Sequence, residues 1–173
     1  MDLKKMLEKN HSKTQSNAIA YYIGNNANRF KALLKVYLDG PYRITQRAAW
    51  PLSICVERWP YLIDPHLKKI LDYLDKPGIH DAVRRNTMRL LQFIDIPKRY
   101  HGRVANLCFA YLQDRKTAVA IRVFSMTVLS HIIKDQPDIK KEFVMILEDE
   151  LPYGSAAFLS RAKRVLKEIA KQE

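Results

Sequence analysis

The residues of this sequence that could do chemistry are arginines grouped near a tryptophan. Arg43, Arg47 and Trp50 are spaced i, i+4 and i+7, which places them on one side of the chain if this segment is helical. A guanidinium group beside an indole can stack on a nucleic-acid base or hold an acidic or aromatic side chain of a peptide. The pattern therefore indicates a binding surface. Alternatively, Trp50 simply packs against N-terminal helices, because large aromatic side chains are mostly buried.

Further basic candidates lie in the segment 79–95. At 100° per residue, one face of this segment is apolar and predicts the core side of a helix; it contains Val83, Thr87, Leu90, Leu91 and Ile94. Arg85 and Arg89 point roughly the opposite way, so we expect them to face solvent or a partner. Arg84 lies at the edge of the core face.

Arg84 also belongs to a set of arginines that recur at gaps of 37, 38 and 39 residues, namely Arg47, Arg84, Arg122 and Arg161. Repeat proteins use residues at equivalent positions to join one unit to the next. We expect these side chains to bond a turn aspartate or a neighbouring repeat, while Arg122 also remains a candidate for contact with a partner. The complete set of partner-binding candidates is Arg43, Arg47, Trp50, Arg85, Arg89 and Arg122.

The sequence contains no recognisable catalytic or metal-binding motif. Its five histidines are scattered, and we find no H-E-x-x-H, no glycine-rich phosphate loop and no G-x-S-x-G. The two cysteines, Cys55 and Cys108, lie in separate apolar runs and predict buried free thiols in a reducing compartment. We therefore expect no catalytic residue, no cofactor and no metal.

A recurring sequence pattern predicts the helices that position these arginines. "YLDGP" begins at Tyr37 and "YLDKPG" at Tyr73, and "AYLQD" and "ILEDELPYG" occupy the corresponding places further on. A period in the high thirties is typical of two-helix repeats that stack to bury their apolar faces. Glycine is scarce, with 5 residues in 173, and prolines stand mostly where apolar periodicity stops, so we expect an all-α fold.

The predicted helices are 2–9 and 15–23, followed by the pairs 26–38 and 42–58, 65–74 and 80–94, 100–112 and 117–134, and 139–150 and 155–171. We interpret residues 1–173 as one domain, in which 1–24 form an N-terminal helical cap and 25–173 about four two-helix repeats. Pro51 falls inside the helix predicted at 42–58. It should kink or split that helix, because proline lacks the amide donor and clashes with the preceding turn.

These features resemble HEAT or armadillo-type helical repeats over about residues 26–171. The resemblance rests on an arginine early in each second helix and on aspartates in the turns, namely Asp39, Asp75, Asp114 and Asp149. It implies a right-handed α-α superhelix, or solenoid, whose second helices line the concave surface.

The charged residues are unevenly distributed along the chain, which predicts the charge of the concave surface. The formal net charge is +12, and the segment 79–122 carries nine basic and three acidic side chains, whereas 135–150 carries two basic and six acidic ones. A basic groove is therefore expected, which would attract any polyanion. The sequence shows neither a signal peptide nor a membrane span, so we expect a cytoplasmic protein without membrane contact.

Two functional hypotheses follow. The leading one is a non-enzymatic binding scaffold whose basic concave surface docks an acidic protein segment or another polyanion. The alternative is nucleic-acid binding of the DNA-alkylation-repeat type, with or without glycosylase activity, because the chain is also similar to those proteins in its helical repeats and basic charge. The nearest candidates for that chemistry are Trp50, Trp59, Asp81 and Arg85, although no local motif aligns them.

Overall fold

The structure is a computed structural model that describes residues 3–9 and 11–171, and α-helices with short 3₁₀ turns make up its regular structure. The helices of the described part are α1 (Leu3–Lys9), α2 (Lys13–Ile23), α3 (Ala27–Asp39), α4 (Tyr42–Arg58), α5 (Leu67–Leu74), α6 (Asp81–Leu91), α7 (His101–Gln113), α8 (Val119–Ile132), α9 (Lys140–Glu150) and α10 (Ala156–Ala170). The predicted all-α class and the pairing of helices along the chain are confirmed.

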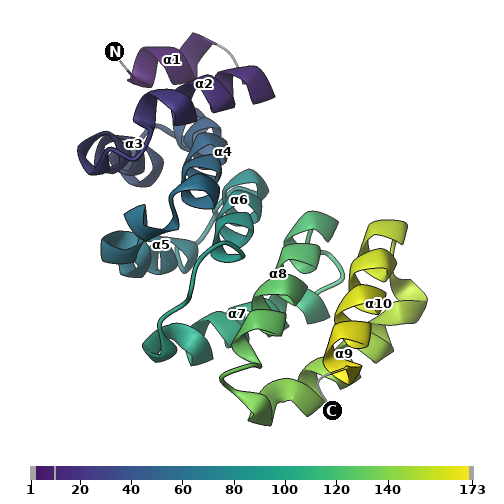
Figure 1. The fold of residues 1–173 in the computed structure, drawn as a ribbon. Coiled ribbons are helices and arrows are strands. Elements are labelled where there is room, and N and C mark those ends of the chain that lie inside the picture. Colours follow the sequence, from purple (N-terminus) through teal and green to yellow (C-terminus); the bar gives the residue numbers. More distant parts are fainter. Residues whose placement is uncertain (1–2, 10, 172–173) are drawn as a thin grey trace. The chain divides into compact units, whose positions relative to one another are not determined.

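The chain divides into two compact units. Helices α1 to α6, with the chain up to Ile94, form unit 1, and helices α7 to α10, with the chain from Asp95 onward, form unit 2 (Figure 1). The interpretation of the whole chain as one domain stays a prediction, and we describe each unit by itself.

Several helices begin where a side chain accepts a hydrogen bond from a backbone amide of the first turn. Ser12 accepts from the amide of Gln15 at the start of α2, and Asn26 accepts from the amide of Arg29 at the start of α3. Ser155 does the same for α10. These caps satisfy donors that have no partner within the helix. They explain why the helices start within a few residues of the predicted positions.

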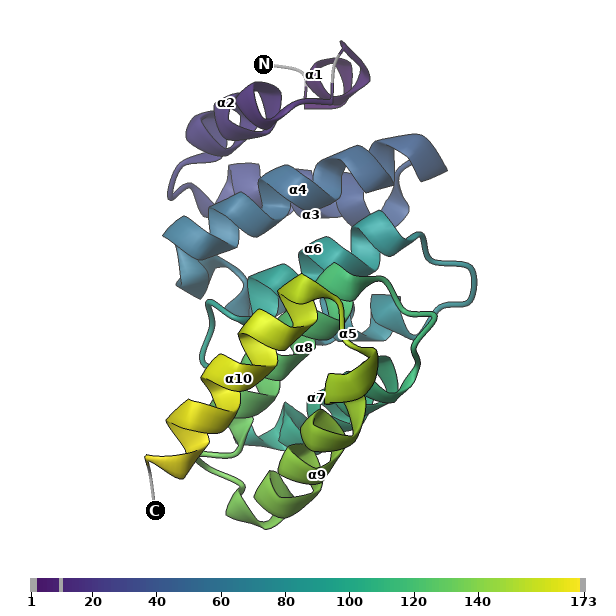
Figure 2. The ribbon, with the colours of Figure 1, turned by 90° about the vertical axis from the view of Figure 1, so that its right-hand side faces the viewer.

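In unit 1 the second helices of successive pairs, α2, α4 and α6, pack side by side, and α3 lies against α4 (Figure 2). A buried hydrogen bond of 2.6 Å joins Tyr37 of α3 to the hydroxyl of Thr87 in α6. The Thr87 hydroxyl donates to the carbonyl of Val83, so the Tyr37 hydroxyl is the donor to Thr87. Pro51 is buried inside α4, which continues through it, so the expected split of this helix is wrong.

In unit 2, α8 packs against both α7 and α10, and α7 also packs against α9. The core between α7 and α9 includes an edge-to-face contact of Phe109 with Phe143, whose ring centroids are 6.4 Å apart. Phe143 is fully buried, as is Phe158 near the start of α10. Cys108 of unit 2 and Cys55 of unit 1 are buried free thiols, as predicted. Burial raises the pKa of each thiol to about 12.

Gly40, in the "YLDGP" turn, is a position where a side chain does not fit. A Cβ atom there would clash with the carbonyl oxygen of Val36, which accepts the Gly40 amide hydrogen bond. We therefore expect Gly40→Ala to destabilise unit 1 by about 1–3 kcal/mol, since the turn must shift. Gly102, within α7, meets nothing within 4 Å, so Gly102→Ala should stabilise by about 0.5–1 kcal/mol. Urea unfolding of both variants measures whether the two changes in stability have opposite signs. A loss of stability in both variants would contradict the prediction for Gly102.

Candidate binding surface

Helices α4 and α6 carry the basic residues of unit 1 that are best placed to contact a binding partner. Arg43, in the first turn of α4, and Arg85, in the middle of α6, are exposed. Within the part of the chain that the structure describes, neither side chain makes a hydrogen bond or an ion pair. We define the α4–α6 surface as Arg43, Arg47, Trp50 and Arg85 together with the adjacent His11.

Arg47 is one turn beyond Arg43 on α4, but its guanidinium is already engaged. Its Nη1 atom donates to the carbonyl oxygens of Leu7 and Glu8, at 2.9 and 2.8 Å. These carbonyls belong to the last turn of α1, where the backbone acceptors have no partner within the helix. Arg47 therefore caps α1 and fixes it to α4, which is the joining role that the periodicity predicts.

Trp50 and His11 meet beside Arg47. Trp50 is half-buried, and its ring contacts His11 edge-to-face with the centroids 5.8 Å apart. This contact supports the alternative in which Trp50 packs against the N-terminal segment. Burial lowers the pKa of His11, and the positive charges of Arg47 and Arg85 lower it further. His11 thus contacts Trp50 and lies within the electrostatic field of Arg47 and Arg85.

Arg89 is predicted to face solvent or a partner, but in the structure its guanidinium contacts α4. Its Nη1 atom donates to the hydroxyl of Ser53 at 2.9 Å, and its Nη2 atom forms an ion pair with Glu57, both on α4. The phase of α6 alone predicts an exposed side chain, but α4 packs beside α6 and supplies both partners. Arg89 therefore joins two neighbouring second helices and is less available to a partner than Arg85.

Among the partner-binding candidates, Arg122 is the least available to a partner. It is only 5% exposed, and its Nε and Nη2 atoms donate to the carbonyl of Leu112 at 3.2 and 2.7 Å. Nη2 also pairs with Glu150 at 2.7 Å, and the guanidinium lies over the ring of Phe158. Arg122 thus joins three elements inside unit 2, because Leu112 is in α7, Glu150 ends α9 and Phe158 is in α10.

Glu150 is the residue that sequence reasoning missed. Its carboxylate accepts from Arg122 and also from Nε and Nη2 of Arg115, at 3.0 to 3.1 Å. Hydrogen bonds from Arg115, and then from Arg122, hold the pKa of Glu150 below its ordinary value. A signal was present, since Phe143, Leu147 and Glu150 are spaced i, i+4 and i+7 and so share the core face of α9.

The other periodic arginines differ in their partners. Arg161 of α10 donates to the hydroxyl of Thr127 in α8 and so joins neighbouring repeats, as predicted. Among the described residues, Arg84 pairs with Asp81 of its own helix alone, at 3.4 Å, so the predicted bond to a turn aspartate or to another repeat is wrong at this position. Asp114 accepts hydrogen bonds from Lys116 and Thr117 within its own turn. It therefore stabilises the turn and does not bond a periodic arginine.

Comparison with known proteins agrees with this architecture. The sequence profile of the HEAT repeat domain matches residues 3–169, and the chain belongs to this family of helical repeat proteins. No curated protein and no solved structure matches the chain.

Among the described residues, no group of three or more His, Cys, Asp or Glu side chains could hold a metal ion. In the same part of the chain, every helix is too short or too polar to cross a membrane.

Proposed function

We propose that this HEAT-repeat scaffold is a non-enzymatic binding protein that docks an acidic protein segment on the α4–α6 surface. Arg43 and Arg85 carry this proposal, because both are exposed and keep their donors available on neighbouring helices. Arginine forms short, charge-assisted hydrogen bonds to carboxylates, often in pairs. Trp50, two turns beyond Arg43 on α4, is half-buried and contacts the exposed ring of His11, which suits a peptide that carries an apolar or aromatic residue near its acids.

Nucleic-acid binding is the alternative that the geometry favours less. It needs several arginines converging on phosphates, but three candidates give their donors to protein groups: Arg47 to α1, Arg89 to Glu57 and Arg122 to Glu150. The residues that resemble a glycosylase site are also divided, because Asp81 pairs with Arg84 and Trp59 lies just beyond the end of α4.

Salt dependence separates the two functions. We would measure the binding of a fluorescein-labelled oligoglutamate peptide and of a labelled DNA duplex by anisotropy, at several concentrations of salt between about 50 and about 200 mM. We expect the peptide to bind with a shallow dependence of log K on log salt, since two arginines make the main contacts, and the duplex to bind more weakly. Tighter binding of the duplex with a steep negative slope would replace this proposal with the nucleic-acid function. Binding of neither probe would refute both.

A further inference from the structure

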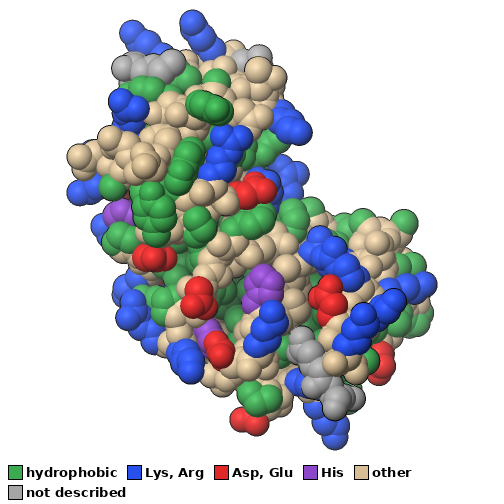
Figure 3. Space-filling model, in the orientation of Figure 1, with side chains coloured by type: hydrophobic (Ala, Val, Ile, Leu, Met, Phe, Trp, Pro, Cys, Tyr) green, Lys and Arg blue, Asp and Glu red, His purple; other side chains and the backbone are tan. Residues whose placement is uncertain are grey.

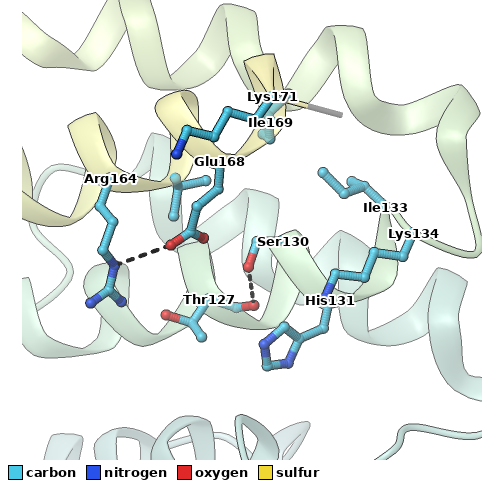
Figure 4. A pocket seen from close by; sticks show the side chains of 10 residues that line it. Thr127, Ser130, His131, Ile133, Lys134, Arg164, Glu168, Ile169 and Lys171 are labelled. Atoms are coloured by element: carbon cyan, nitrogen blue, oxygen red, sulfur yellow. Dashed lines mark hydrogen bonds and ion pairs between the residues drawn. The ribbon is translucent and has the colours of Figure 1, made fainter. Parts of the chain in front are cut away.

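Unit 2 has a pocket between its two second helices, α8 and α10. The pocket has a volume of about 490 Å³ and is lined by residues from the C-terminal half of each helix and from the turn that follows each (Figure 4). A space of this size can receive a large side chain of a bound peptide. The pocket shares no residue with the α4–α6 surface.

The pocket combines an apolar floor with a basic rim. Its apolar lining comes from Ile133, Val165 and Ile169, which pack into the core of the unit. Around them stand three exposed cations, Lys134, Arg164 and Lys171, against one acid, Glu168. Arg164 and Glu168 form a loose ion pair of 3.7 Å in which both side chains are more than half exposed. Basic side chains lie over α8 and α10 on the face shown in Figure 3.

The polar groups of the pocket do not suit a phosphate or another small anion. The hydroxyl of Ser130 gives its proton to the carbonyl of Thr127 at 2.7 Å, and the hydroxyl of Thr127 accepts from Arg161. The remaining donors are mainly on long, exposed side chains, so no rigid set of donors surrounds a single point. The pocket also lies at the C-terminal ends of two helices, where the helix dipole disfavours an anion inside it, so the acids of a ligand belong on the exposed rim and not in the pocket.

We propose that this pocket receives one apolar side chain of an acidic peptide segment, the acids of which lie against Lys134, Arg164 and Lys171. This inference rests on the class of partner proposed above but places a second, separate contact on unit 2. The apolar floor selects the anchoring residue, because burying a side chain such as leucine is favourable in proportion to the apolar area removed from water. The rim supplies the preference for acids on either side of the anchor.

The test uses the full chain, labelled with ¹⁵N, and a capped pentapeptide in which two glutamates stand on each side of a central leucine. A second peptide has glycine in place of the leucine. We expect the leucine peptide to shift the amide signals of Ser130, His131 and Glu168, and to bind this pocket about tenfold more tightly than the glycine peptide. Equal affinity of the two peptides for the pocket would overturn the role of the apolar floor.

Two variants of unit 2 separate the floor from the rim. Ser130→Phe should fill the pocket without a change in charge and abolish the preference for leucine. Lys134→Glu with Lys171→Glu should weaken both peptides about equally. The control is Lys163→Glu with Lys167→Glu, which makes the same change in charge at exposed positions of α10 outside the pocket and should leave the affinity of the pocket for both peptides nearly unchanged. Circular dichroism would confirm that each variant is folded.

The outcomes distinguish this inference from the proposed function. Suppose that the leucine peptide shifts only α4 and α6 signals and that Ser130→Phe leaves its affinity unchanged; the pocket inference then fails while the function stands. If the peptide shifts only the α8–α10 signals, the inference holds and the assignment to the α4–α6 surface fails. The absence of any shift would overturn both.

Discussion

Replacing Glu150 by alanine should destabilise unit 2 by about 3–5 kcal/mol, because Arg122 would remain buried without its counter-charge. Arg122 would keep the carbonyl of Leu112 but lose the carboxylate that it contacts at 2.7 Å. Arg115 would lose its contacts with the same carboxylate, although its side chain is about half exposed and contributes less. The loss is large because one carboxylate ties α9 to the start of α8 and to the turn between α7 and α8.

Urea unfolding followed by circular dichroism measures this loss. The neighbouring acid Asp149 is exposed, so Asp149→Ala is the control and should change stability by less than about 0.5 kcal/mol. Both tryptophans, Trp50 and Trp59, belong to unit 1, so their fluorescence follows unit 1 while circular dichroism follows the helices of both units. Equal effects of the two substitutions would contradict the role assigned to Glu150.

The same carboxylate predicts a dependence on pH. The pKa of Glu150 is lowered in the folded protein, so its contribution is complete above the ordinary value of 4.5 and is lost as the pH falls through the folded pKa. The difference in stability between the wild type and Glu150→Gln should therefore shrink as the pH is lowered below 4.5. A difference that stays constant down to acid pH would show that the charge of Glu150 is not what stabilises unit 2.

The helices were predictable from local signals. Apolar periodicity places Val83, Thr87 and Leu90 on the core side of α6, and the structure buries all three. Turn residues such as Gly40 mark where helices end, because this information lies within a few residues of each boundary. The uninterrupted course of α4 through Pro51 could not be predicted, since it depends on the helices packed around that residue.

The partners of the arginines were harder to predict than their positions. Periodicity identifies Arg47, Arg122 and Arg161 as joining residues, and each of them bonds a group from another helical pair. It does not reveal which acid faces which arginine, because that depends on how neighbouring helices pack. Arg89 illustrates this, since its phase on α6 points away from the core and yet meets Glu57 of α4.

Reversing the charge of Arg43 and Arg85 together should weaken the binding of the acidic peptide at least about a hundredfold. Each arginine would lose a charge-assisted hydrogen bond worth about 1.5–3 kcal/mol, and the glutamates would also repel the ligand. We would measure the affinity of Arg43→Glu with Arg85→Glu for oligoglutamate by anisotropy at low salt. Stability should change little, because both side chains are exposed and make no hydrogen bond or ion pair within the described residues.

The matched control is Lys31→Glu with Lys35→Glu, which makes the same change in net charge on α3. Both lysines are exposed and lie in unit 1, but on the first helix of their pair. The fold-loss of affinity of this variant should be less than about a fifth of the fold-loss of the arginine variant. Only the long-range field of the protein changes, and salt screens that field. A loss equal to that of the arginine variant would mean that net charge, and not the α4–α6 surface, determines binding.

Hydrogen exchange of the whole chain with saturating acidic peptide at low salt tests most directly whether the second helices of unit 1 bind the partner. Slower exchange in α4 and α6, with no change in α3 and α5, is the expected result. Slowing confined to α3 and α5 would contradict the assignment, because the partner would then lie on the first helices of the repeats.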